Sequence, residues 1–195
     1  METNNNKPMA TSQAEKIQGA IRDYNVMMDY LCSSRESFCR LREYLDEHNF
    51  IGMPASANHH LNVAGGLVLH SVNVAHTLQD FTTHLGLTWQ RKDSPIIVGL
   101  LHDLCKLDSY RYNAKDDKWY YNDKQEIDVG GHGIASVVLA QRFIQLTDEE
   151  LYCIRYHMGA YEQKDWSKYD LAIRRYPNVL YTHTADMVAS KLMED

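Results

Sequence analysis

A histidine and an aspartate stand side by side, His102 and Asp103, inside the most apolar segment of this chain. That segment, GLLHDLCKL at residues 99–107, predicts a helix that is buried on nearly every side. Two polar side chains are costly to bury without strong partners. Neighbours on a helix also point about 100° apart, so they rarely share one ordinary partner. A metal cation at the helix edge could bind both side chains. The alternative is a buried hydrogen-bond network of the pair with Lys106, without a metal.

The apolar spacing elsewhere is mostly helical and predicts an all-α fold. Helices are expected over residues 12–31, 34–47, 66–85, 96–107, 133–145, 148–158 and 178–193. Ser94 and Pro95 have the pattern of an N-cap and a first helical residue. Thr147 begins a capping box. Residues 159–177 are expected to be irregular, with a boundary at Pro177.

One segment, at about residues 109–128, predicts a small β-hairpin insertion rather than a helix. Its aromatic residues flank a polar turn on both sides: Tyr110, Tyr112, Trp119, Tyr120 and Tyr121. A chain of 195 residues fits one domain. We expect that domain over residues 12–195, after a polar, disordered lead-in of residues 1–11.

Composition excludes several classes of protein. A hydrophobic content of 44% with 24% charged residues is ordinary for a globular domain. No apolar run approaches the roughly 20 residues that cross a bilayer, and the N-terminus lacks the apolar stretch of a signal peptide. We therefore expect a cytoplasmic protein, with its four cysteines reduced. A net charge of −6 disfavours long nucleic acids as partners but permits a small anion held by a metal.

Further histidines and an aspartate occur in or at the ends of the predicted helices. Together with the His-Asp pair they make a candidate ligand set: His70, His102, Asp103, His132, His157 and Asp186. Imidazole and carboxylate groups bind one or two divalent ions such as manganese, iron, zinc or nickel. Taken alone, His70 would be a hydrogen-bonded core histidine, and the nearby His-Asp pair favours the ligand interpretation. Asp186 leans inward on the last predicted helix, where Ala185 and Ala189 leave room, and the alternative is an exposed or capping residue.

Other residues are candidates for contact with a substrate. Lys106 shares a helix face with the His-Asp pair, so its ammonium can reach a bound phosphate or other anion. His183, one turn before Asp186, is either a rival ligand or a partner that fixes Asp186. His59 and His60 are either surface residues or substrate contacts at the mouth of the site, and His60 is taken as a substrate contact.

The order of these residues resembles the H…HD…D signature of the HD-domain superfamily of metal-dependent phosphohydrolases. LHDLCK at residues 101–106 resembles its HDxxK variant, and GGLVLH at residues 65–70 resembles its GGLxxH motif. The resemblance covers about residues 50–195 and implies an HD-domain helical bundle. By the resemblance, one metal would be held by His70, His102, Asp103 and Asp186. His132 and His157 resemble the di-metal branch, in which Asp103 would bridge two ions.

That branch contains phosphodiesterases, nucleases and nucleotide phosphohydrolases. The resemblance implies that a metal-bound hydroxide attacks a phosphate ester or anhydride in a small, nucleotide-like substrate, with Asp103 and Lys106 as catalytic residues. Two alternatives stay open: a di-iron oxygenase on the same scaffold, and a non-catalytic nucleotide or metal sensor. A Gly-Tyr-Pro motif is absent after His157, which disfavours the cyclic-dinucleotide branch. The native metal, the substrate and the oligomeric state stay open.

Overall fold

The computed structural model describes residues 12–57, 61–123, 130–159 and 166–194. Its elements are α1 (Gln13–Ser34), α2 (Ser37–Glu47), the 3-10 helix η1 (Phe50–Gly52), α3 (Gly66–Leu85), α4 (Ser94–Leu101), α5 (Lys106–Ser109), β1 (Tyr110–Asn113), β2 (Lys118–Tyr121), α6 (His132–Ala140), α7 (Asp148–Tyr156), α8 (Trp166–Arg175), α9 (Asn178–Val188) and the π-helix η3 (Ala189–Met193). The fold is all-α with a two-stranded hairpin insertion, as the sequence predicts. The predicted disordered lead-in and His59 and His60 lie outside the described residues.

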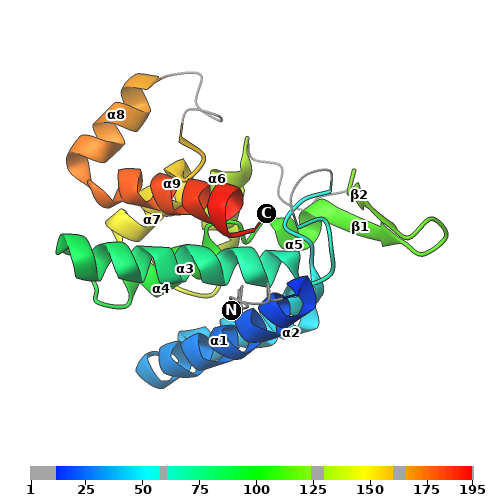
Figure 1. The fold of residues 1–195 in the computed structure, drawn as a ribbon. Helices are drawn as coiled ribbons and strands as arrows, with labels where there is room; N and C mark the ends of the chain where they lie inside the picture. Colours follow the sequence, from blue (N-terminus) through cyan, green and yellow to red (C-terminus); the bar gives the residue numbers. More distant parts are fainter. Residues whose placement is uncertain (1–11, 58–60, 124–129, 160–165, 195) are drawn as a thin grey trace, which may run out of the picture.

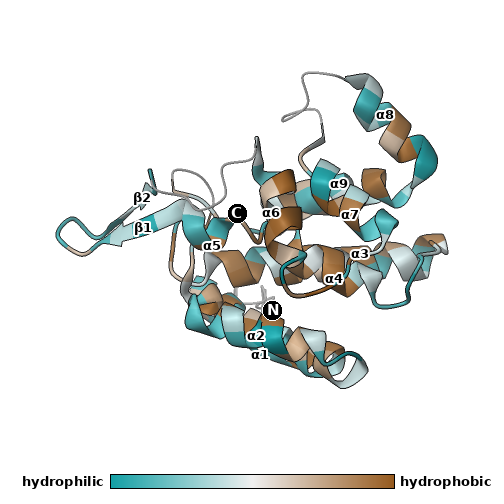
Figure 2. Ribbon diagram, turned by 180° about the vertical axis from the view of Figure 1, so that it is seen from behind, coloured by the Kyte–Doolittle hydropathy of each residue, from teal (hydrophilic) through white to brown (hydrophobic). Residues whose placement is uncertain are grey.

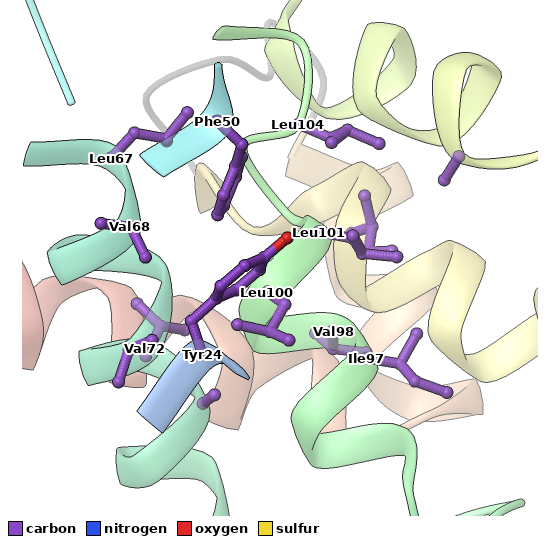
Figure 3. Close-up of a cluster of buried hydrophobic side chains, with 14 of the residues drawn as sticks. Tyr24, Phe50, Leu67, Val68, Val72, Ile97, Val98, Leu100, Leu101 and Leu104 are labelled. Carbon is purple, nitrogen blue, oxygen red and sulfur yellow. The ribbon is translucent and has the colours of Figure 1, made fainter. Parts of the chain in front are cut away.

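Helix α3 is central, and it contacts α1 on one side and α4 and α9 on others (Figure 1). Figure 3 shows Tyr24 of α1 and Phe50 of η1 beside Leu100 and Leu101 of α4. All four side chains are buried, and burial of an apolar side chain of this size stabilises the fold by about 1.5–3 kcal/mol. A side chain at Gly99 would clash with the α3 backbone at Ala75, so glycine lets α4 approach α3 closely.

The predicted helix 96–107 is wrong in extent, because α4 ends at Leu101 and the chain turns before α5 begins at Lys106. The backbone N–H of Cys105 donates to the side chain of Ser136 on α6, at 3.1 Å. This tertiary hydrogen bond replaces the helical one that a continuous helix would need. The His-Asp pair therefore lies at the C-terminal end of a helix and not within one.

The predicted N-cap at Ser94 is also wrong, because the helix already begins at that residue and Asp93 is its N-cap. The Ser94 hydroxyl instead donates to Glu150 on α7, at 2.8 Å, in the buried interior. Pro95 is the second helical residue, one position later than predicted, and still lies in the first turn. The capping box at Thr147 is confirmed, since its side chain and that of Glu150 each accept a hydrogen bond from the other's backbone N–H.

The predicted irregular stretch 159–177 contains a helix, α8, over its described part. Only Tyr169 and Ala172 of α8 are buried, so the apolar stripe is too narrow to be recognised in the sequence. Pro177 is the N-cap residue of α9, which confirms the predicted boundary there. Helix α9 then continues directly into the π-helix η3.

The hairpin pairs Tyr110 with Tyr121 and Tyr112 with Trp119 in an antiparallel register. It projects from the helices (Figure 1) and is largely hydrophilic along its length (Figure 2). Its base is anchored, because Tyr110 is buried against the core. Within the described part of the chain, no helix combines the length and the apolar character needed to cross a bilayer.

Candidate metal centre

Five of the six predicted ligands converge in the folded chain. Their donor atoms form two overlapping groups, one of His70, His102 and Asp186, the other of His102, Asp103 and His157. Within each group the donors lie within 4.8 Å of one another. They come from α3, from the ends of α4 and α7, and from α9. Segments far apart in the sequence thus meet at one end of α3.

His102 and His157 are the C-cap residues of α4 and α7. The Nδ1–H of His102 donates to the carbonyl of Gly99 at 2.9 Å, and the Nδ1–H of His157 donates to the carbonyl of Ile154 at 2.7 Å. Carbonyls in the last turn of a helix have no intrahelical partner, so each accepts the ring N–H that follows it. Both rings are thereby fixed in one tautomer, with Nε2 turned toward the cluster.

His70 lies within α3 and is bonded on both sides of its ring. Its Nε2 is 3.2 Å from Asp186 Oδ1 and 3.1 Å from His102 Nε2. Its Nδ1 is 3.1 Å from Glu194 Oε1. The imidazole therefore lies between two acidic groups from the C-terminal part of the chain.

Asp103 joins the two groups of donors. Its Oδ2 is 3.5 Å from His102 Nε2 and 3.6 Å from His70 Nε2. Its Oδ1 is 3.4 Å from His157 Nε2. Lys106 Nζ is 2.5 Å from Oδ2, so the predicted contact of the lysine with the pair is present. The carboxylate therefore contacts histidines of both groups.

The charges of the cluster follow from burial and from these contacts. Burial alone would lower the pKa of His70, but Asp186 and Glu194 outweigh it and raise that pKa to about 10. Burial lowers the pKa of His102 to about 4, although Asp103 opposes the shift. Burial would raise the pKa of Asp103, yet Lys106 and His102 hold it well below the usual range. Without a metal, then, His70 is protonated, His102 is neutral and Asp103 is ionised.

Asp103 Oδ1 and His157 Nε2 are buried and lie 3.4 Å apart, but neither makes a hydrogen bond of good geometry among the described residues. Buried polar atoms are nearly always paired, and an ion bound between these two atoms would satisfy both. Two nitrogens each about 2.1 Å from one ion lie about 3 Å apart when the angle between the bonds is near 90°. The 3.1 Å between the Nε2 atoms of His70 and His102 matches that spacing. The residues present therefore fit a divalent metal.

His132, the sixth predicted ligand, belongs to neither group of donors. It is the exposed first residue of α6 and lines the same pocket, and its Nδ1 lies 3.6 Å from Cys105 Sγ. His183 also lines the pocket, and its Nδ1–H donates to the carbonyl of His157 at 2.7 Å. It thus contacts the backbone of His157, one of the predicted ligands. The roles of both histidines stay predictions, and His60 lies outside the described residues.

A pocket of about 630 Å³ opens onto the cluster, a volume typical of sites for small molecules. The side chains with polar atoms in its wall are Ser56, His70, Asp103, Lys106, Tyr110, Tyr121, His132, His183, Asp186, Ser190 and Lys191. The sequence analysis missed Lys191 and Glu194. Neither residue belongs to a motif, and only their position after Asp186 could have indicated them.

Comparison of the chain with protein-family models, with curated proteins and with solved structures found no match. Three buried imidazoles and two carboxylates beside a lysine can hold a divalent ion and an anionic group together.

Proposed function

We propose that this protein is a metal-dependent phosphohydrolase that acts on a phosphate ester or anhydride of a small, nucleotide-like substrate. The observation that carries the proposal is the convergence of His70, His102, Asp103, His157 and Asp186 on one buried cluster beneath a pocket. The motif order that resembles the HD-domain superfamily supports the same chemistry.

The five converging residues would hold one or two divalent ions, of manganese, iron, zinc or nickel, with Asp103 between the two groups. When bound, such ions supply Lewis-acid charge and activate water for attack on phosphorus. The neutral ring of His102 is ready to act as a ligand at physiological pH, because burial keeps its pKa near 4. His70 must first lose the proton at Nε2, so metal binding releases a proton.

Lys106 would stabilise the negative charge that develops on the phosphoryl oxygens. Its ammonium contacts Asp103, which overcomes the effect of burial and raises the pKa of the lysine. The side chain therefore stays cationic at any physiological pH. It also lines the pocket, where a substrate phosphate would approach the cluster. Lys191, which also lines the pocket, would add a second positive charge.

The test uses protein purified without chelators, loaded with each metal in turn, and a panel of nucleotides and other phosphate esters. We expect metal-dependent release of phosphate from at least one class of substrate. Lys106→Met should lower kcat by about 100-fold, a loss typical of one charge-stabilising donor. His76→Ala is the matched control, because His76 is also on α3 but its side chain is 46% exposed and contacts Asp23.

The alternatives give different results in the same preparation. Absence of hydrolysis across the panel by metal-replete protein would contradict the proposal. Oxygen uptake and a mixed-valence EPR signal after anaerobic iron loading would identify a di-iron oxygenase instead. Tight nucleotide binding without turnover at any metal composition would identify a sensor.

A further inference from the structure

The histidines of the cluster differ in what holds their rings. His102 and His157 end helices and use a free carbonyl of their own last turn. His70 is the fifth residue of α3, which runs from Gly66 to Leu85. Carbonyls within a helix already accept N–H groups four residues further along. The Nδ1–H of His70 therefore needs an acceptor from another part of the chain.

Glu194 supplies that acceptor. Its two carboxylate oxygens lie 3.1 and 3.2 Å from His70 Nδ1, across a separation of 124 residues. Asn73, one turn further along α3, donates its side-chain amide to Glu194 Oε1 at 3.1 Å. The Glu194 side chain has no exposed surface. A fully buried carboxylate is costly unless it is paired and hydrogen-bonded, so these contacts define a specific position.

The chain brings Glu194 to this position by continuing past Asp186 through the π-helix η3. π-helical turns are rare and occur frequently at functional sites. Met193 is held from two other helices, because Lys16 Nζ donates to its carbonyl at 3.1 Å and the Thr77 hydroxyl contacts its sulfur at 3.7 Å. In Figure 1 this end of the chain lies beside the beginning of α3. One continuous segment thus places an acidic group on each nitrogen of His70.

We propose that Glu194 is a positioning residue of the metal centre: it accepts a hydrogen bond from His70 Nδ1–H and so holds Nε2 toward the ion. A carboxylate behind a histidine ligand fixes its tautomer and ring orientation and increases its basicity. The inference rests on the proposed metal centre but not on hydrolysis, so it can be tested by metal binding alone.

The test measures the affinity of the full chain for cobalt and zinc by competition with a chromophoric chelator. Glu194→Ala should weaken binding by about 10–100-fold, the usual effect of losing such a partner, and should change the visible spectrum of bound cobalt. Glu194→Gln keeps an acceptor oxygen of the same shape, so most of the affinity should return. Lys16→Met is the control, because it removes a contact of Met193 and leaves the His70–Glu194 hydrogen bond in place.

The proposal would be overturned if Glu194→Ala kept the wild-type metal affinity and cobalt spectrum. Equal losses of affinity in the alanine and glutamine variants would also overturn it, as would a loss of the same size in Lys16→Met. If the alanine variant does not fold, nitrogen-15 NMR of the zinc-loaded wild type decides the matter. We expect the ring proton of His70 to be on Nδ1. A ring without a proton on Nδ1 would overturn the positioning role of Glu194. Metal binding without any turnover would contradict the proposed function and leave this inference standing.

Discussion

The candidate metal centre has two parts, which differ in what orients their histidines: a helix-end part, with His102 and His157, and a C-terminal part, with His70, Asp186 and Glu194. His102 and His157 receive their orientation from their own helices, over a separation of three residues each. His70 receives its orientation from Asp186 and Glu194, which follow it by more than a hundred residues. The first part can form as soon as α4 and α7 end correctly. The second part requires the C-terminal segment to fold back onto α3, and so it should be the more sensitive to substitution.

The largest expected effect is on the stability of the metal-free protein. His70→Ala would leave the largely buried carboxylate of Asp186 and the fully buried carboxylate of Glu194 without their shared cation. Removing one partner of a buried ion pair costs about 3–5 kcal/mol. Urea unfolding in the presence of a chelator measures the loss. His102→Ala is the comparison. Because the His102 ring is neutral, we expect a smaller loss of unfolding free energy in this variant. An equal loss in the two variants would contradict the difference between the two parts of the site.

The next effect concerns Asp103, whose carboxylate contacts both parts. Asp103→Asn keeps the shape of the side chain but removes the charge between the histidines and Lys106. We expect metal affinity to fall by more than about 100-fold, beyond the range for an outer partner of a ligand. Isothermal calorimetry or chelator competition measures it. Retention of the wild-type affinity would show that Asp103 serves a buried network and not a metal.

A third expectation concerns pH in the metal-free protein. The pKa of His70 is raised from its usual value of 6.5 to about 10 in the folded state, because Asp186 and Glu194 outweigh the effect of burial. A group with a raised pKa contributes its full stabilisation below the unfolded value and loses it as the pH rises toward the folded value. The free energy of unfolding should therefore decline between about pH 6.5 and 10. In His70→Gln this decline should be reduced, and an unchanged pH profile would contradict the assignment.

The smallest effect is expected at His132, which is exposed and lies outside both groups of donors. His132→Ala should change the free energy of unfolding by less than about 0.5 kcal/mol, as is usual for surface residues. The ion held by the buried cluster should remain. Metal analysis of the purified variant checks this, and complete loss of metal would place His132 among the essential ligands.

The sequence predicted those parts of the site that follow from local spacing. The contact of Lys106 with Asp103 follows from a separation of three residues, and the inward position of His70 follows from the apolar stripe of its helix. The end of α4 was not predictable in this way, because it depends on a hydrogen bond from Cys105 to Ser136 on another helix. The role of Glu194 was not predictable either, because only the tertiary fold brings its carboxylate to His70.

The most direct test of the metal centre is anomalous diffraction from crystals of protein purified without chelators. If these residues hold a metal, we expect a peak at about 2.0–2.2 Å from Nε2 of His70 and His102 and from a carboxylate oxygen. That oxygen should belong to Asp103 or Asp186, the acidic members of the two donor groups. The proposed metal centre would be contradicted by metal-replete crystals that show no peak among these residues. His102, Asp103 and Lys106 would then be bonded only to one another.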